Sequence, residues 1–345
     1  MPDLNVNAVG LPRPWLVADI GGTNARFGWL AEDSVTISHV ATLPAAGHAG
    51  PGDAAAHYLA DLAVSLGSAY RPPRAAAFAV ATAVGSDPIF FTNSDWALSR
   101  RDTQAALNLD ELLVLNDFEA LALSLPRLQP QQLRAWPGVA MPAARTTLAV
   151  IGPGTGLGVA GLVPTADGHW AAVPGEGGHA TLSAADDFDA AVLAVVRREH
   201  PHVSAERLLS GIGLPTLYGA VAAVLGQAAA PSHSALPWPL TTELIVERGL
   251  DGSDAVCSRT LDVFCALLGS FAGNVALVLG ARGGVYIGGG IVPRLGERFF
   301  QSAFRQRFEA KGRFEPYLQA IPTLLIIDTL AALNGGVQAL VQQRR

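Results

Sequence analysis

The chain has 345 residues, of which 50% are hydrophobic and 15% are charged, so its composition is that of a globular protein and not of a disordered one. This length is sufficient for about two domains, each with its own core. The net charge of −6 and the lack of any basic run longer than an Arg pair argue against nucleic acid or an anionic membrane surface as a main partner.

Lysine and cysteine are both scarce, and their positions argue against several classes of enzyme. Lys311 is the single lysine and lies in a polar stretch, FEAKGRFEP. P-loop proteins, protein kinases and Schiff-base enzymes need a lysine in a glycine-rich or apolar setting, so they are poor candidates. Cys257 and Cys265 favour a reduced, cytoplasmic chain over a disulfide framework or a zinc site. The first residues lack the pattern of a signal peptide, so none is expected.

The first predicted element is a hairpin at residues 16–30, LVADIGGTNARFGWL. Its first strand ends near Asp19, and the glycines and asparagine of Gly21–Asn24 are typical of a turn with positive φ. Such a turn leaves backbone N–H groups pointing outward, which suits phosphate oxygens, and Asp19 could hold a hydrated Mg²⁺. An ordinary hairpin with an acid at the strand end is the alternative.

The next segments alternate between strands and helices. Helices are predicted at residues 53–66, 99–107 and 118–125, and strands at 74–82 and 112–115. This alternation indicates an α/β architecture, in which ligands bind at the carboxyl ends of the strands. Asn116 and Asp117 follow the second strand directly. Residues 126–145 show no period and predict a surface excursion between two lobes.

A second strand–glycine–strand unit, LAVIGPGTGLGVAGLV, follows at residues 148–163. It matches the opening hairpin at an offset of 133 residues, which places Gly154 where the first unit has Gly21. The repetition indicates an internal duplication and two similar lobes that face a cleft. Each lobe would then offer one turn to the same phosphate chain.

The second unit also contains the letters of a dinucleotide-binding fingerprint. Gly156, Gly158 and Gly161 spell G-x-G-x-x-G. That fingerprint must follow a strand directly and open a helix, whereas these glycines begin inside the turn and lead into an apparent strand. We therefore do not predict a Rossmann unit.

The rest of the chain adds polar loops and one unusually apolar helix. Residues 173–179, VPGEGGH, form a glycine-rich loop, and residues 202–207 are expected to cap a helix that continues to residue 213. Residues 263–280 are long and apolar enough to span a membrane, but their polar side chains and flanking charges favour a helix buried in a soluble protein. A strand at 283–294 with three glycines, a closing strand at 323–327 and a final helix complete the pattern.

Phosphoryl transfer from a nucleotide to an alcohol requires backbone donors, a divalent cation, and a group that receives the alcohol proton. Asp117 is the best candidate for that group, although its unperturbed pKa of about 3.9 makes it a weak base. A polyhydroxy substrate needs further acceptors and amides. Asn93, Asn116, Glu176, His179 and Glu206 could supply them. Structural alternatives are an Asx turn for Asn93, a plain loop histidine for His179, and a helix start for Glu206.

Seven blocks of the sequence, in this order, resemble the bacterial glucokinases of the hexokinase–actin–Hsp70 superfamily. They are DIGGTNARFG at Asp19, TNSDWA at Thr92, LNDFEALA at Leu115, GPGTGLGVA at Gly152, PGEGGHA at Pro174, VSAERLLSGIGL at Val203 and GGVYIGGGIVPR at Gly283. The resemblance implies a two-lobed actin-like ATPase (ribonuclease H-like) α/β fold with a cleft between two domains. The small domain would comprise residues 1–126 and 328–345, and the large domain residues 127–327.

The same resemblance implies a role for each candidate residue. Asp117 would be the catalytic base, and the sugar hydroxyls would be held by Asn93, Asn116, Asp117, Glu176, His179 and Glu206. ATP would be bound by Asp19 (through Mg²⁺ and water), Gly21, Gly22, Thr23, Asn24, Gly154, Thr155, Gly156, Gly288, Gly289 and Gly290. The implied reaction is the ATP- and Mg²⁺-dependent conversion of glucose to glucose 6-phosphate by a cytoplasmic enzyme, often a homodimer.

Two other functions stay open from the sequence alone. The sugar could be another hexose such as mannose, fructose or an acetylated amino sugar, or the protein could be a non-catalytic sugar sensor. The chain departs from the family in having Asn334-Gly335-Gly336 where a Gly-Ser-Gly run is expected. It also lacks the cysteine-rich zinc motif of related repressor–kinase proteins.

Overall fold

The computed structural model describes residues 11–91, 95–138, 145–227 and 240–343, and the chain divides into two compact units. Unit 1 comprises residues 1–128, 165–172 and 328–345, and unit 2 comprises residues 129–164 and 173–327. The sequence-based division places residues 165–172 in the larger domain, whereas here they group with unit 1. Two hydrogen bonds tie this stretch to the C-terminal helix, from Trp170 N to Gln342 Oε1 at 2.8 Å and from Gln342 Nε2 to Trp170 O at 3.0 Å.

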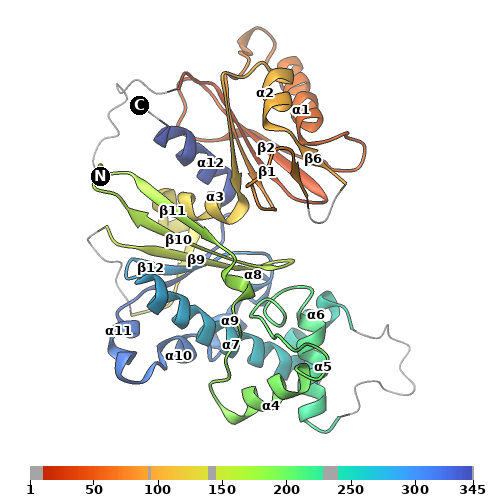
Figure 1. Cartoon of the computed structure of the whole chain (residues 1–345), viewed down its shortest axis with the longest axis vertical. Helices are drawn as coiled ribbons and strands as arrows, with labels where there is room; N and C mark the ends of the chain where they lie inside the picture. Colours follow the sequence, from red (N-terminus) through yellow and green to blue (C-terminus); the bar gives the residue numbers. More distant parts are fainter. Residues whose placement is uncertain (1–10, 92–94, 139–144, 228–239, 344–345) are drawn as a thin grey trace. The chain divides into compact units, whose positions relative to one another are not determined.

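Unit 1 is built around a five-stranded sheet in the order β3-β2-β1-β4-β7. Figure 1 labels β1 and β2 of this sheet, with α1 and α2 in the same unit. Its elements are β1 (Trp15–Ile20), β2 (Asn24–Leu30), β3 (Ser38–Pro44), α1 (Pro51–Leu66), β4 (Ala75–Val80), β5 (Ile89–Phe90), β6 (Ala97–Leu98), α2 (Arg100–Ala106), β7 (Glu111–Asn116), α3 (Asp117–Ser124) and α12 (Ala331–Gln342). β1 runs antiparallel to β2 and parallel to β4, and β4 runs parallel to β7. The carboxyl ends of β1, β4 and β7 therefore lie at one edge of the sheet.

Unit 2 contains a six-stranded sheet in the order β11-β10-β9-β12-β13-β8, with most of its helices on the chain segments between the strands. Its elements are β8 (Leu133–Ala135), β9 (Leu148–Pro153), β10 (Leu157–Pro164), β11 (Trp170–Gly175), α4 (Asp187–Val196), α5 (Leu214–Val224), α6 (Thr242–Asp251), α7 (Ala255–Leu279), β12 (Gly284–Ile287), α8 (Val292–Leu295), α9 (Glu297–Gln301), α10 (Phe304–Glu309), α11 (Glu315–Gln319) and β13 (Thr323–Ile326). β11 begins in the stretch that groups with unit 1.

The two sheets repeat the same strand pattern, which supports the predicted duplication. β9 runs antiparallel to β10 and parallel to β12, and β12 runs parallel to β13. Strands β9, β10, β12 and β13 thus correspond to β1, β2, β4 and β7. The extra strand β8 lies in the segment predicted to be irregular, and its three residues pair antiparallel with β13. A strand this short carries too few residues to show a period in sequence.

Alternating side chains of β1 face two separate hydrophobic clusters, as expected for a sheet covered on both faces. Leu16, Ala18 and Ile20 pack in a cluster with α1, whereas Trp15 and Val17 pack in a cluster with α12. All three β1 residues of the first cluster are fully buried. The C-terminal helix therefore completes the core formed by the first third of the chain.

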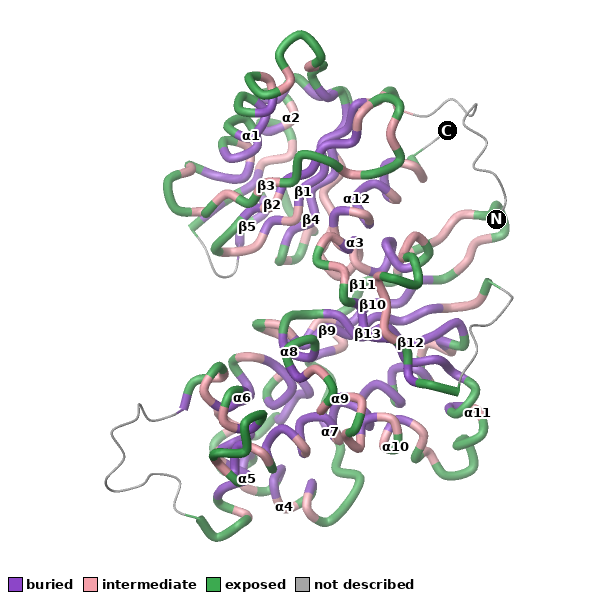
Figure 2. The backbone as a smooth tube through the Cα atoms, turned by 180° about the vertical axis from the view of Figure 1, so that it is seen from behind, coloured by how far each residue is buried: buried purple, intermediate pink, exposed green. Residues whose placement is uncertain are grey.

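Helix α7 is the apolar helix predicted from the sequence, and it is a core helix of unit 2. It is long and apolar enough to cross a membrane, but 72% of its most apolar window is buried inside the protein (Figure 2). Both cysteines lie buried in α7 and are free, as predicted. Burial raises the pKa of the thiols of Cys257 and Cys265 to about 12, which keeps them neutral.

The prediction that residues 202–207 cap a helix continuing to residue 213 is wrong, because this stretch forms successive turns and α5 begins at Leu214. Ser210 Oγ donates to Glu206 O at 2.7 Å and accepts from Gly213 N at 3.0 Å. A Cβ on Gly213 would lie 2.6 Å from Arg207 O, so the chain folds back closely on itself here. The glycines serve this close approach and do not end a helix.

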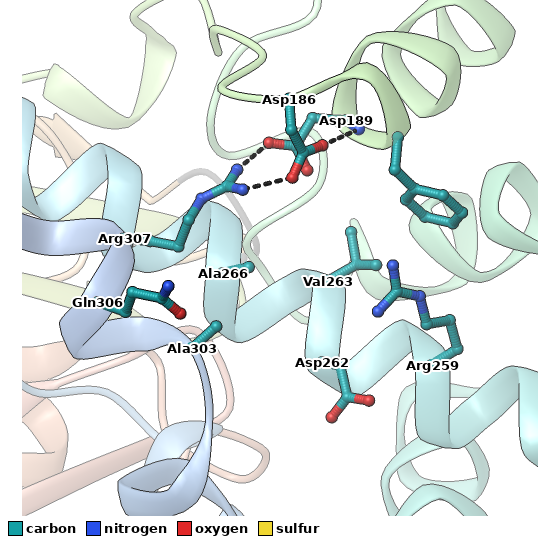
Figure 3. A pocket seen from close by; sticks show the side chains of 10 residues that line it. Asp186, Asp189, Arg259, Asp262, Val263, Ala266, Ala303, Gln306 and Arg307 are labelled. Atoms are coloured by element: carbon teal, nitrogen blue, oxygen red, sulfur yellow. Dashed lines mark hydrogen bonds and ion pairs between the residues drawn. The ribbon is translucent and has the colours of Figure 1, made fainter. Parts of the chain in front are cut away.

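A pocket of about 310 Å³ lies in unit 2 between α4, α7 and α10 (Figure 3). Three of the charged side chains that line it, Asp186, Asp189 and Arg307, form ion pairs with one another. Arg307 donates to Asp186 Oδ2 at 2.5 Å, to Asp189 and to Ser270 Oγ at 3.0 Å. The Asp189 side chain is only 4% exposed, so Arg307 compensates a buried charge. Arg259, in contrast, lies over the Phe188 ring at 4.4 Å.

Replacing Arg307 by lysine is expected to lower the free energy of unfolding by about 1–2 kcal/mol, because a point charge cannot reproduce the planar fork that serves three acceptors. Arg259→Lys is the matched control in the same pocket. Its exposed side chain makes only the ring contact, and we expect a change within about 0.5 kcal/mol. Urea unfolding of both variants measures the difference, and equal losses would contradict this role of Arg307.

Candidate active site

The first predicted phosphate turn lies between β1 and β2, as expected. Ile20 pairs with Ala25 at the end of the ladder, and Gly21 N donates to Asn24 O at 2.9 Å across the turn. Ala45 N donates to Thr23 O at 2.8 Å, which fixes the turn from the side of β3. The Thr23 and Asn24 side chains are exposed and can reach a ligand.

Asp19 lies one residue before the end of β1, opposite Arg26 of β2. Burial raises the pKa of its carboxyl group, and the charge of Arg26 opposes that effect. Within the described ranges there is no group of three or more His, Cys, Asp or Glu residues that could hold a metal directly. A single carboxylate nevertheless fits Mg²⁺, which keeps several waters and binds through one or two carboxylates together with substrate phosphates.

Asp117 is the first residue of α3, directly after β7. Burial raises the pKa of its carboxyl group to about 6, the charge of Asp19 adds to this, and the hydrogen bonds from Phe118 N and Asn116 oppose it. The register Ile20–Val80–Asn116 places the ends of β1, β4 and β7 at the same level. The structure thus brings Asp117 to the same sheet edge as Asp19 and the first turn.

Asn116 is largely engaged with the backbone. Its Oδ1 accepts from Phe118 N at 2.9 Å and from Glu119 N at 3.4 Å, and its Nδ2 donates to Thr82 O at 3.3 Å. Glu119 Oε2 accepts from Asn116 N in return, which completes a capping box at the start of α3. Asn116 therefore fixes the start of α3 and the position of Asp117. Asn93 lies outside the described residues.

The second predicted phosphate turn lies between β9 and β10 in unit 2. Pro153 pairs with Leu157, and Gly154 N donates to Gly156 O at 2.9 Å. The turn is therefore one residue shorter than the turn between Ile20 and Ala25. Nothing lies within 4 Å of a Cβ built on Gly154, so this backbone is open on its outer side.

Glu176, His179 and Glu206 lie around this second turn. A short 3-10 helix, Gly177–His179, follows Glu176, and Gly178 packs so closely on Leu157 that a Cβ would lie 1.9 Å from its carbonyl oxygen. His179 Nε2 lies 3.8 Å from Glu206 Oε1, and their side chains are 60% and 27% exposed. Both lie with Arg207 and Ser210 around a cavity of about 230 Å³. These residues can present acceptors and a donor to a polar ligand.

The three glycines after β12 lie against the same turn. Gly288 N donates to Ile151 O at 2.8 Å, and Ile291 N donates to Pro153 O at 3.2 Å. Gly289 has a φ of 77°, and a Cβ there would lie 2.4 Å from Pro153 O, so only glycine fits. Gly289 and Gly290 are exposed. This placement agrees with backbone contacts to a nucleotide.

Two features of the site were missed from the sequence. The capping box has a recognisable signal, an Asn followed three residues later by a Glu, at Asn116 and Glu119. The close approach of Gly178 to Leu157 has no such signal, because the partners are more than twenty residues apart in the chain and the contact is made by a backbone oxygen.

The chain is similar to known proteins over nearly its whole length. A family model described as Glucokinase matches residues 16–343. The chain is 48% identical over 320 residues to a glucokinase of Paramagnetospirillum magneticum, covering 93% of this chain and 95% of that protein. It is 43% identical to the "Bifunctional protein glk" of Paraburkholderia xenovorans, covering 96% of this chain but about half, 49%, of that longer protein.

The fold is also that of a solved relative. A crystal structure of glucokinase from an Antarctic psychrotroph superposes with a TM-score of 0.85 at 37% sequence identity, covering 96% of this chain and 99% of that chain. The actin-like α/β fold class predicted from the sequence is thereby confirmed.

Proposed function

The chain belongs to the glucokinase family and therefore phosphorylates glucose with ATP, and we propose that Asp117 receives the proton of the sugar 6-hydroxyl during this transfer. The observation that carries this proposal is the position of Asp117 at the sheet edge that holds the first turn, where burial raises the pKa of its carboxyl group to about 6. A carboxylate with this pKa is ionised at pH 7 and is a stronger base than an ordinary aspartate. In a loose transition state it orients the hydroxyl and takes a proton that leaves late.

The other residues divide between the two substrates. In our proposal the turns Gly21–Asn24 and Gly154–Gly156 donate backbone N–H groups to the phosphates of ATP, and Gly288–Gly290 lie along the adenosine. Asp19 would hold Mg²⁺ through water, and the ion would neutralise charge on the phosphates. The sugar hydroxyls would be held by Asn93, Asn116, Asp117, Glu176, His179 and Glu206.

We also propose a cytoplasmic homodimer. The buried α7 and the free, neutral cysteines are compatible with a reducing compartment. Sedimentation of the purified protein gives the oligomeric state, for which twice the chain mass of 35.8 kDa is expected.

A nucleotide-turnover assay across a panel of hexoses tests the reaction. We expect ADP formation with glucose, Mg²⁺ and ATP, and a lower kcat/KM with mannose, fructose and N-acetylated amino sugars. Product analysis should give glucose 6-phosphate. Binding of glucose without turnover would favour a sugar sensor, and a higher kcat/KM for another hexose would change the substrate but leave the kinase chemistry intact.

The raised pKa of Asp117 predicts the pH dependence of the reaction. Because the proton acceptor must be ionised, kcat/KM should be constant above pH 7 and fall on the acid side with a midpoint of about 6. Asp19→Asn removes a neighbouring like charge, so this midpoint should move to lower pH while the rate also falls. A midpoint near pH 4 in the wild type would contradict the environment described for Asp117.

A further inference from the structure

Glu206 lies directly against the second phosphate turn. Its Oε2 accepts a hydrogen bond from Leu157 N at 2.8 Å, at the residue where the turn re-enters β10. A Cβ on Gly156 would lie 2.5 Å from the same oxygen. The carboxylate therefore occupies the space beside Gly156 and fixes one end of the turn.

The second carboxylate oxygen and the backbone N of Glu206 contact the loop assigned to sugar binding. Its Oε1 lies 3.8 Å from His179 Nε2, and its backbone N donates to Gly178 O at 2.8 Å. His202 Nε2 lies 3.0 Å from His179 O and adds a further tie to this loop. One side chain thus contacts both the loop that follows Glu176 and the phosphate turn.

A second connection runs through the residues after Glu206. Gly211 N donates to Gly154 O at 2.8 Å, and Ile212 N donates to Thr155 O at 3.4 Å. Thr242 Oγ1 donates to Gly211 O and secures the outer side of this stretch from α6. Residues 206–212 are therefore hydrogen-bonded to both ends of the turn.

We propose that Glu206 is a positioning residue for the nucleotide as well as a sugar ligand, so that glucose and nucleotide binding are coupled through its carboxylate. This inference rests on the proposed function of the two segments. A sugar hydroxyl that donates to Glu206 restricts the carboxylate, and the carboxylate restricts Leu157 N and the turn. A change in the turn that displaces the Glu206 carboxylate should therefore alter sugar affinity even when no nucleotide is present.

The first experiment changes the phosphate turn and measures glucose. Gly156→Ala places a methyl group 2.5 Å from Glu206 Oε2 and so displaces the carboxylate, and glucose affinity measured calorimetrically without nucleotide should fall about tenfold or more. Gly154→Ala is the control in the same turn, because its Cβ would have open space. It should change glucose affinity less than about twofold. Thermal melts confirm that both variants are folded.

The second experiment changes Glu206 and measures ADP with Mg²⁺ in the absence of sugar. Glu206→Ala removes the acceptor of Leu157 N, and we expect ADP affinity to fall about fivefold. Glu206→Gln retains an acceptor oxygen, so its ADP affinity should stay within about twofold of the wild type. Rescue by glutamine distinguishes positioning of the turn from general damage to the fold.

Unchanged glucose affinity in Gly156→Ala, or unchanged ADP affinity in Glu206→Ala, would overturn the coupling. Neither result would contradict the phosphorylation of glucose by the wild-type protein. Failure of the wild type to phosphorylate any sugar would instead overturn the proposed function, so the two failures are distinguishable.

Discussion

Replacing Asp117 by asparagine should lower kcat about 10³-fold, within the range of about 10²–10⁴ that a positioned base contributes. The amide has nearly the same shape and its Oδ1 can still accept from Phe118 N, a bond of 2.9 Å in the wild type. The start of α3 should therefore keep its structure. Glucose should still bind, with an affinity reduced less than about tenfold, because only one of the proposed sugar ligands changes.

Glu119→Gln is the matched control for this variant. Glu119 lies two residues along the same helix, and its carboxyl oxygen accepts from Asn116 N, an interaction that glutamine can retain. We expect kcat within about threefold of the wild type. If Asp117→Asn kept its full kcat, the assignment of Asp117 as the base would be wrong, although family membership would be unaffected.

Replacing Gly335 by alanine should destabilise the protein by about 3 kcal/mol or more, at the upper end of the range for overpacking. Gly335 lies in α12 where this helix crosses α3, and an added Cβ would lie 1.7 Å from Ala120 O. The neighbour is backbone of α3, which cannot move without moving Asp117, three residues earlier. Urea unfolding should show a lower midpoint, and the surviving folded fraction should show reduced kcat.

Gly336→Ala provides the comparison at the next residue. Its Cβ would make ordinary contacts of 3.4 Å with Ala77 Cβ and Val17 Cγ1. Alanine also has the higher helix propensity, so we expect a change of about 0.5 kcal/mol or less in either direction. Equal destabilisation by the two substitutions would contradict the close crossing of α12 and α3.

The sequence predicted those parts of the fold whose signals are local. Both hairpins have glycine turns between apolar strands, and Asn116 and Asp117 follow a short apolar strand, so the structure places them at strand ends as predicted. The repeat of the first hairpin was visible because its strand–glycine–strand pattern recurs. Element bounds were correct to within a few residues where a Pro, Ser or Asn marked the start of a helix.

Features that depend on distant contacts could not be predicted in this way. The Asn334-Gly335-Gly336 run was compared with a nucleotide-binding pattern, whereas in the structure Gly335 allows two helix backbones to meet. A helix capped by residues 202–207 was predicted to continue to residue 213, but hydrogen bonds to the turn at Gly154 and Thr155 determine the course of this stretch. Helices α4, α5 and α6 were not predicted.

The two halves of the duplicated fold have diverged in charge at corresponding strand ends. Asp19 faces Arg26 across the first hairpin, whereas the second hairpin has Gly152 facing Gly158. In the proposed function an acid at position 152 would place a carboxylate beside the phosphates without the neighbouring cation that Asp19 has in Arg26. The two turns are therefore unequal in that proposed function: the first would bring a carboxylate for the metal, and the second would offer backbone N–H groups alone.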